Sequence, residues 1–128
     1  MSPASADYKG EQLLREMLQP GLAKKVTIHL NEDTSAEQDF LYNEIFSFLF
    51  EHGIAGASLI RPEAGFGSHH RVHPPHGRAH MPVRIEFIEH PATVERVLPK
   101  LCALLSDGLI EAHDTTVYKA AEAREELP

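Results

Sequence analysis

The chain has 128 residues, 42% of them hydrophobic, which suffices for one domain with a hydrophobic core and is too much for a disordered chain. It carries 12 lysines and arginines against 19 aspartates and glutamates, so its net charge is −7 with histidine neutral. This acidic balance, without a basic run, argues against nucleic acid as a partner, because phosphate contacts need clustered cations.

The cysteine content and the apolar runs predict a cytoplasmic protein. The single cysteine, Cys102, excludes an internal disulfide and suits a reducing compartment. Residues 1–7 have neither the basic nor the apolar region of a signal peptide, and no apolar run approaches the ~20 residues that a membrane-spanning helix needs. We therefore expect no membrane insertion.

Composition divides the chain into three parts. Residues 1–22 are punctuated by proline and glycine and are expected to form an N-terminal extension, partly helical or flexible. Residues 23–119 show the alternating periodicities of a folded domain. Residues 120–128 form a charged C-terminal tail.

Hydrophobic spacing predicts the first strand and the first helix. Apolar and polar residues alternate over 25–30, as in a strand with one buried face. The helix that follows is expected to run to about His52 and to end at Gly53, and capping-box spacings that could open it start at Thr34 and at Ser35. Its apolar stripe consists of Leu41, Ile45, Phe48 and Leu49, whereas Phe46 and Phe50 lie off that stripe.

Two further strands and a second helix follow. The strands are expected over 57–61 and 82–88, with a long irregular segment at 63–81 between them. The second helix should start at Pro91, because proline is favoured in the first turn, and Pro99 should kink it. Its apolar stripe consists of Val94, Val97, Leu98, Leu101 and Leu105.

The last strand is expected over 109–119, so the element order is β-α-β-β-α-β. This order predicts an α+β, ferredoxin-like sandwich: an antiparallel sheet with both helices on one face and a long loop between strands two and three. The opposite face of the sheet, here called the open face, can be exposed to solvent or line the centre of an oligomer, and the off-stripe phenylalanines favour the oligomer. Its expected side chains are Lys25, Thr27, His29, Arg84, Glu86 and Ile88.

Short motifs are spread over about residues 22–119. They are Asn31-Glu-Asp33, Tyr42, Gly53-Ile-Ala-Gly-Ala57, Gly65-Phe-Gly67 with His73 six residues on, Met81-Pro-Val83 and Leu98-Pro99. In combination they resemble the PII-like family catalogued as domain of unknown function 190, which is related to PII signalling proteins and to CutA. The resemblance implies a ferredoxin-like subunit of a homotrimer, with a small effector bound between subunits and a regulatory role.

The glycine tripeptide is the first candidate for effector binding. Two glycines around one residue permit positive φ and let backbone N–H groups approach an anion. The tripeptide also matches the motif at the base of the T-loop in PII signalling proteins. The resemblance therefore implies an adenine nucleotide or a similar anion as the effector, with Gly65, Phe66, Gly67 and His73 as binding residues. Arg71 is added to these candidates as a nearby cation.

Departures from the PII pattern limit this expectation. Ser68-His-His-Arg71 stands where PII proteins have arginine, glutamine and lysine, and the loop at 106–108 lacks a lysine for phosphates. Tight binding of ATP is therefore not expected. The alternatives for the ligand are a mononucleotide, a different small effector or a metal ion. The cations suggested as contacts for an anion are Arg71, Arg78 and Lys119.

Five of the nine histidines lie within twelve residues of the segment 63–81: His69, His70, His73, His76 and His80. Imidazole is a common ligand of Zn²⁺ and Cu²⁺, so the alternative function is a CutA-like divalent metal-binding module that uses this loop. A solvated loop whose charge follows pH, or a surface that docks a partner, explains the same residues.

No catalytic constellation is apparent. The sequence shows no His/Asp arrangement that would activate Cys102, and this cysteine is expected to be a core residue on the second helix. Glu32 and Asp33 are explained by the favourable interaction of negative charge with a helix N-terminus. We therefore predict a non-enzymatic, PII-like regulator. It would bind its effector in clefts between subunits and signal through the loop 63–81 to an unidentified target protein.

Overall fold

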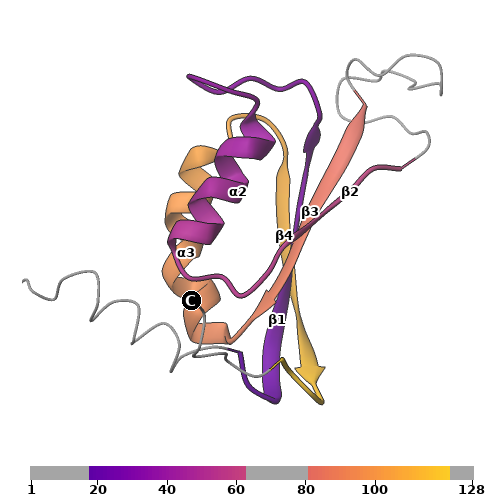
Figure 1. Ribbon diagram of the computed structural model, residues 1–128, viewed down its shortest axis with the longest axis vertical. Helices are drawn as coiled ribbons and strands as arrows, with labels where there is room; N and C mark the ends of the chain where they lie inside the picture. Colours follow the sequence, from indigo (N-terminus) through magenta and orange to yellow (C-terminus); the bar gives the residue numbers. More distant parts are fainter. Residues whose placement is uncertain (1–17, 63–80, 122–128) are drawn as a thin grey trace, which may run out of the picture.

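The computed structural model describes residues 18–62 and 81–121, which form four strands and two helices. The strands pair in the order β2-β3-β1-β4, and every pairing is antiparallel. Both helices lie on one face of this sheet (Figure 1), which confirms the predicted ferredoxin-like sandwich. The elements are β1 (Gly21–Asn31), α2 (Leu41–Glu51), β2 (Ser58–Ile60), β3 (Pro82–Glu89), α3 (Pro91–Leu104) and β4 (Leu109–Val117).

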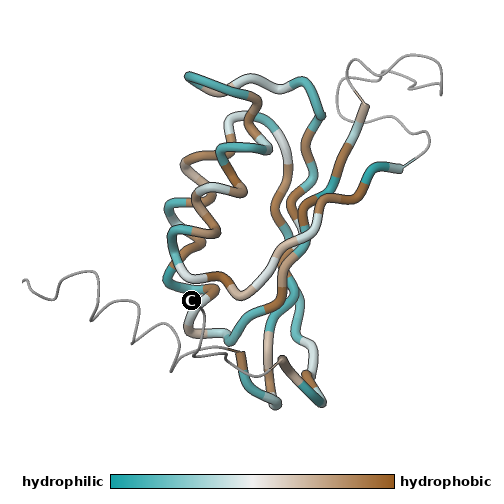
Figure 2. Tube along the Cα trace, viewed as in Figure 1, coloured by the Kyte–Doolittle hydropathy of each residue, from teal (hydrophilic) through white to brown (hydrophobic). Residues whose placement is uncertain are grey.

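The core lies between the helices and the central strands β1 and β3. Val26 is the register partner of Phe87, and Ile28 is the partner of Ile85, so their side chains share the helix face of the sheet. Figure 2 shows hydrophobic residues along the facing parts of helices and strands, and hydrophilic residues at the turn before α2. The fully buried large side chains are Val26, Ile28, Leu41, Ile45, Leu49, Val83, Ile85, Val94, Val97 and Leu101.

Helix α2 begins later than either capping box predicted. Its N-cap is Phe40, and no side chain caps the helix N-terminus. A closed turn precedes it, in which Ser35 bridges to Phe40 and the Ala36 N–H donates to the Asp39 carbonyl at 2.8 Å. The capping-box prediction was wrong because this turn, and not a helical turn, satisfies the backbone that follows Thr34.

The C-terminus of α2 is as predicted. Gly53 has a φ of 82°, in the left-handed region where glycine is favoured. Its N–H donates to the Phe50 carbonyl at 3.2 Å, and the Ile54 N–H donates to the Leu49 carbonyl at 3.1 Å. This pair of hydrogen bonds is a Schellman motif, and the buried side chains of Ile54 and Leu49 provide the accompanying apolar contact.

Helix α3 begins at Pro91, as predicted, and continues through Pro99. Proline cannot donate a backbone hydrogen bond, but Pro99 lies on the exposed side of the helix, where water can satisfy the freed carbonyl. The prediction that Cys102 belongs to the core was wrong, since the thiol is exposed. Neither α2 nor α3 has the length and the apolar character of a membrane-spanning helix.

The two phenylalanines outside the predicted α2 stripe differ in their surroundings. Phe46 is partly buried and packs against the core, whereas Phe50 is 83% exposed. Helix α2 therefore has an additional core contact at Phe46 and an apolar surface position at Phe50.

Gly108 connects α3 to β4 under a tight steric constraint. It has a φ of 151°, and a Cβ atom at this position would clash with the backbone oxygen of His29 on β1. We expect Gly108→Ala to lower the free energy of unfolding by about 2 kcal/mol or more, because backbone has to move. Urea denaturation of both proteins measures this difference.

Gly56→Ala is the matched control for that substitution. A Cβ atom at Gly56 meets nothing within 4 Å, and Gly56 does not have positive φ. Its free energy of unfolding should stay within about 0.5 kcal/mol of the wild-type value. Equal effects of the two substitutions would contradict the steric account of Gly108.

Candidate functional site

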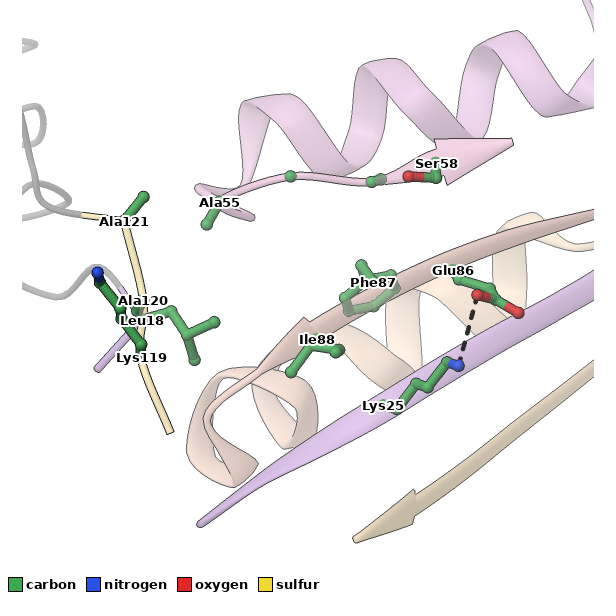
Figure 3. Close-up of a pocket in the computed structure, with 12 residues that line it drawn as sticks. Leu18, Lys25, Ala55, Ser58, Glu86, Phe87, Ile88, Lys119, Ala120 and Ala121 are labelled. Atoms are coloured by element: carbon green, nitrogen blue, oxygen red, sulfur yellow. Dashed lines mark ion pairs between the residues drawn. The ribbon is translucent and has the colours of Figure 1, made fainter. Parts of the chain in front are cut away.

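A pocket of about 510 Å³ lies beside β3, next to the loop that joins α2 to β2 (Figure 3). The chain contributes to it from Leu18 before β1, from Lys25 of β1, from the α2–β2 loop and the first residue of β2, from the end of β3 and from the segment after β4. Pockets of this size are typical of small-molecule sites. The lining residues are Leu18, Lys25, Ala55, Gly56, Ala57, Ser58, Glu86, Phe87, Ile88, Lys119, Ala120 and Ala121.

Strand register places one wall of the pocket on the open face of the sheet. Lys25 is the register partner of Ile88, and Ser58 is the partner of Glu86. Because side chains alternate along a strand, these residues point away from the helices. The period-2 patterns of β1 and β3 therefore bring a polar pair and an apolar side chain to the same pocket.

Charged groups of both signs contact one another along this wall. The Lys25 Nζ lies 3.5 Å from Glu86 Oε1, and the Arg84 Nε lies 3.4 Å from Glu86 Oε2. The Glu86 side chain is 24% exposed, less than either cation. Lys119 lies on the other side of the pocket, near Leu18 (Figure 3).

Small residues make the opposite wall. Ala55, Gly56 and Ala57 follow the Schellman motif, and their short side chains leave the backbone accessible at the pocket. Figure 3 shows this loop across the pocket from Ile88 and Phe87. The wall offers apolar surface and backbone polar groups to a ligand, and Lys25 and Lys119 offer positive charge.

The described lining holds few ionisable side chains. Glu86 is the one carboxylate among the lining residues, which include neither histidine nor cysteine. The described part of the pocket combines apolar surface with the cationic side chains of Lys25 and Lys119.

Further ion pairs join β1 to β4, away from the pocket. On the open face, His29 Nε2 lies 2.8 Å from Glu111 Oε2. On the helix face, Lys24 Nζ donates to Asp114 Oδ1 at 2.7 Å. This hydrogen bond, with the positive charge of Lys24, lowers the pKa of the Asp114 carboxyl below its ordinary value. Both pairs are substantially exposed, so they contribute little to stability.

The residues that the sequence assigned to effector and metal binding lie outside the described parts of the chain. These are Gly65, Phe66, Gly67, His69, His70, Arg71, His73, His76 and His80, together with Arg78. Within residues 18–62 and 81–121, no group of three or more His, Cys, Asp or Glu side chains could hold a metal ion. The metal-binding alternative therefore stays a prediction about the loop. Lys119, the third suggested cation, lines the pocket.

Sequence reasoning missed most of the pocket. The run Gly53-Ile-Ala-Gly-Ala57 is one of the motifs of the family resemblance, but its residue types do not indicate a pocket wall. The alternation of polar and apolar residues predicts Lys25 and Glu86 on the open face, but it does not predict a pocket beside them. The missing information was the pairing of β1 with β3, which brings the two charges together, and the return of the chain at Ala120 and Ala121.

Comparisons with known proteins match nearly all of the described domain. The sequence pattern of DUF190, described as an uncharacterized ACR family, matches residues 23–117. The UPF0166 protein MJ1524 of Methanocaldococcus jannaschii is 33% identical over 100 residues, which cover 76% of this chain and 93% of the relative.

Similar solved structures include the nitrogen regulatory PII-like protein CPII from Thiomonas intermedia K12, bound to ADP, AMP and bicarbonate. One structure of that complex has a TM-score of 0.59 at 18% identity and covers 77% of this chain and 90% of that chain. A second has a TM-score of 0.55 at 19% identity and covers 75% and 94%. At this level of identity the likeness establishes a common fold.

Proposed function

Because the chain belongs to the DUF190 family and has the fold of PII-like proteins, we propose that it is a ligand-binding regulatory protein whose effector is an adenine nucleotide or a similar small anion. The pocket beside β3 is the observation that carries this proposal. In CPII, a protein of the same fold, the bound molecules are ADP, AMP and bicarbonate.

The chemistry of the pocket suits a nucleotide. Ile88 and the α2–β2 loop offer apolar surface to a planar base, and Lys119 offers a cation to a phosphate on the other side. The backbone of residues 55–57 supplies polar groups beside the apolar surface. Such a combination of apolar lining and a few placed polar groups is what orients a small ligand.

The charge balance of the pocket favours one or two phosphates over three. Lys25 is already paired with Glu86, so Lys119 is the lining cation with least competition from that carboxylate. We therefore expect AMP and ADP to bind more tightly than ATP.

The loop and the subunit contacts complete the proposed mechanism. We propose that Gly65, Phe66, Gly67, Arg71 and His73 contribute to effector binding and that the chain assembles as a homotrimer with the effector in clefts between subunits. The resemblance to PII signalling proteins supports both the role of these loop residues and the homotrimer. Ligand binding would then reorder the loop 63–81 and change its contact with a target protein, without a chemical reaction.

Isothermal titration with AMP, ADP and ATP tests the effector. Lys119→Ala should weaken ADP binding about tenfold, because it removes a charge-assisted contact to phosphate. Lys100→Ala is the matched control, since Lys100 is exposed on α3 and does not line the pocket. Absence of binding by all three nucleotides in the wild type would overturn the nucleotide proposal, and equal binding by Lys119→Ala would place the ligand elsewhere.

Native mass spectrometry tests the assembly. We expect a species of three chains, because clefts between subunits need neighbouring copies. A protein that stays monomeric at micromolar concentration and still binds ADP would contradict the intersubunit site and leave the pocket itself as the complete site.

A further inference from the structure

A buried carboxylate joins two walls of the pocket. Glu89 is 2% exposed at the end of β3, immediately after the pocket residues Glu86, Phe87 and Ile88. Its Oε2 accepts a hydrogen bond from the backbone N–H of Ala55 at 2.7 Å. Glu89 therefore links the strand wall of the pocket to the loop wall directly.

The next residue makes a similar contact on a third side. His90 Nε2 accepts a hydrogen bond from the backbone N–H of Gln19 at 3.3 Å. Gln19 follows Leu18, which lines the pocket. Two consecutive side chains at the junction of β3 and α3 thus hold two separate segments of the chain in place by accepting from their backbones.

The loop wall depends on this kind of anchor. Ala55 and Gly56 are exposed and have almost no side chain with which to pack. Ile54 is held in the core before them, and β2 pairs with β3 only from Ser58 onward. Segments with few apolar contacts are set by their hydrogen bonds and open easily when those are lost. The Ala55–Glu89 hydrogen bond holds the first residue of this segment.

A carboxyl group is an uncommon choice at so buried a position. Burying a polar group costs free energy that an apolar side chain would not cost, and the hydrogen bond to Ala55 offsets part of that cost. At 2.7 Å the bond is short, so Glu89 holds the Ala55 N–H in a well-defined position. This is a property that a binding wall needs.

We propose that Glu89 is a positioning residue for the pocket: it fixes the loop 55–57 against β3, and His90 gives weaker support to the segment at Leu18. The inference rests on the proposed function, because it assigns Glu89 a role in ligand affinity. Glu89 itself touches no ligand in this proposal and acts through the Ala55 backbone.

Three substitutions in the full chain test the role of Glu89. Glu89→Leu keeps the buried volume and removes the acceptor, and we expect it to weaken ADP binding about tenfold. Glu89→Gln keeps a neutral acceptor and should bind ADP within about threefold of the wild type. His90→Phe should have a smaller effect than Glu89→Leu, because the bond to Gln19 is longer and exposed.

Val97→Ala separates positioning from general destabilisation. Val97 is 1% exposed on α3 and does not line the pocket. At a temperature where all variants are folded, Val97→Ala should bind ADP like the wild type even where its melting temperature falls as much as that of Glu89→Leu. Equal loss of affinity in both would overturn the positioning role.

Hydrogen–deuterium exchange of the unliganded protein provides the independent readout. The peptide that contains Ala55 should exchange faster in Glu89→Leu, and Glu89→Gln should restore most of its protection. Unchanged exchange there, or unchanged ADP affinity despite faster exchange, would overturn the inference. A wild type that binds no nucleotide would overturn the proposed function, whereas the exchange experiment would still decide whether Glu89 holds the loop.

Discussion

The register of β1 between β3 and β4 is the constraint on which the rest of the structure depends. Val26 lies opposite Phe87 on one side and Ala112 on the other, and a slip by one residue would exchange the two faces of the strand. In the observed register, the apolar residues of β1 and β3 meet the helices. Lys25 and Glu86 then fall on the open face, where their charges can contact each other and solvent.

The pocket follows from where the apolar core ends. Ile54 is the last core residue before β2, and the small residues at 55–57 leave the space beside β3 unfilled. A larger side chain there would extend the core at the expense of the pocket. Of these small residues Ala57 packs against the core, whereas Ala55 and Gly56 are exposed, and the Ala55 N–H is held by an acceptor from β3. The small side chains of the loop 55–57 therefore explain two features: the open space of the pocket, and the proposed role of Glu89 in holding the loop.

Sequence patterns predicted the fold because each strand and helix carries a local signal. Alternation identified the two central strands, and Gly53 and Pro91 marked helix ends through their own backbone preferences. The start of α2 was wrong because a closed turn at 35–40 competes with the capping box, and both use the same residue types. The pocket had no local signal, since its walls come from segments that only tertiary pairing brings together.

The charges around Glu86 also decide what kind of binding the pocket supports. The carboxylate lies between Lys25 and Arg84, so much of the positive potential on this wall is already neutralised. A ligand of the proposed site must then gain affinity from apolar contact and from correctly placed backbone groups, with Lys119 as the one additional cation among the described lining residues. Contacts of this kind depend on geometry more than long-range attraction does. Affinity in such a site is therefore sensitive to residues that touch no ligand and only hold the walls at the right separation.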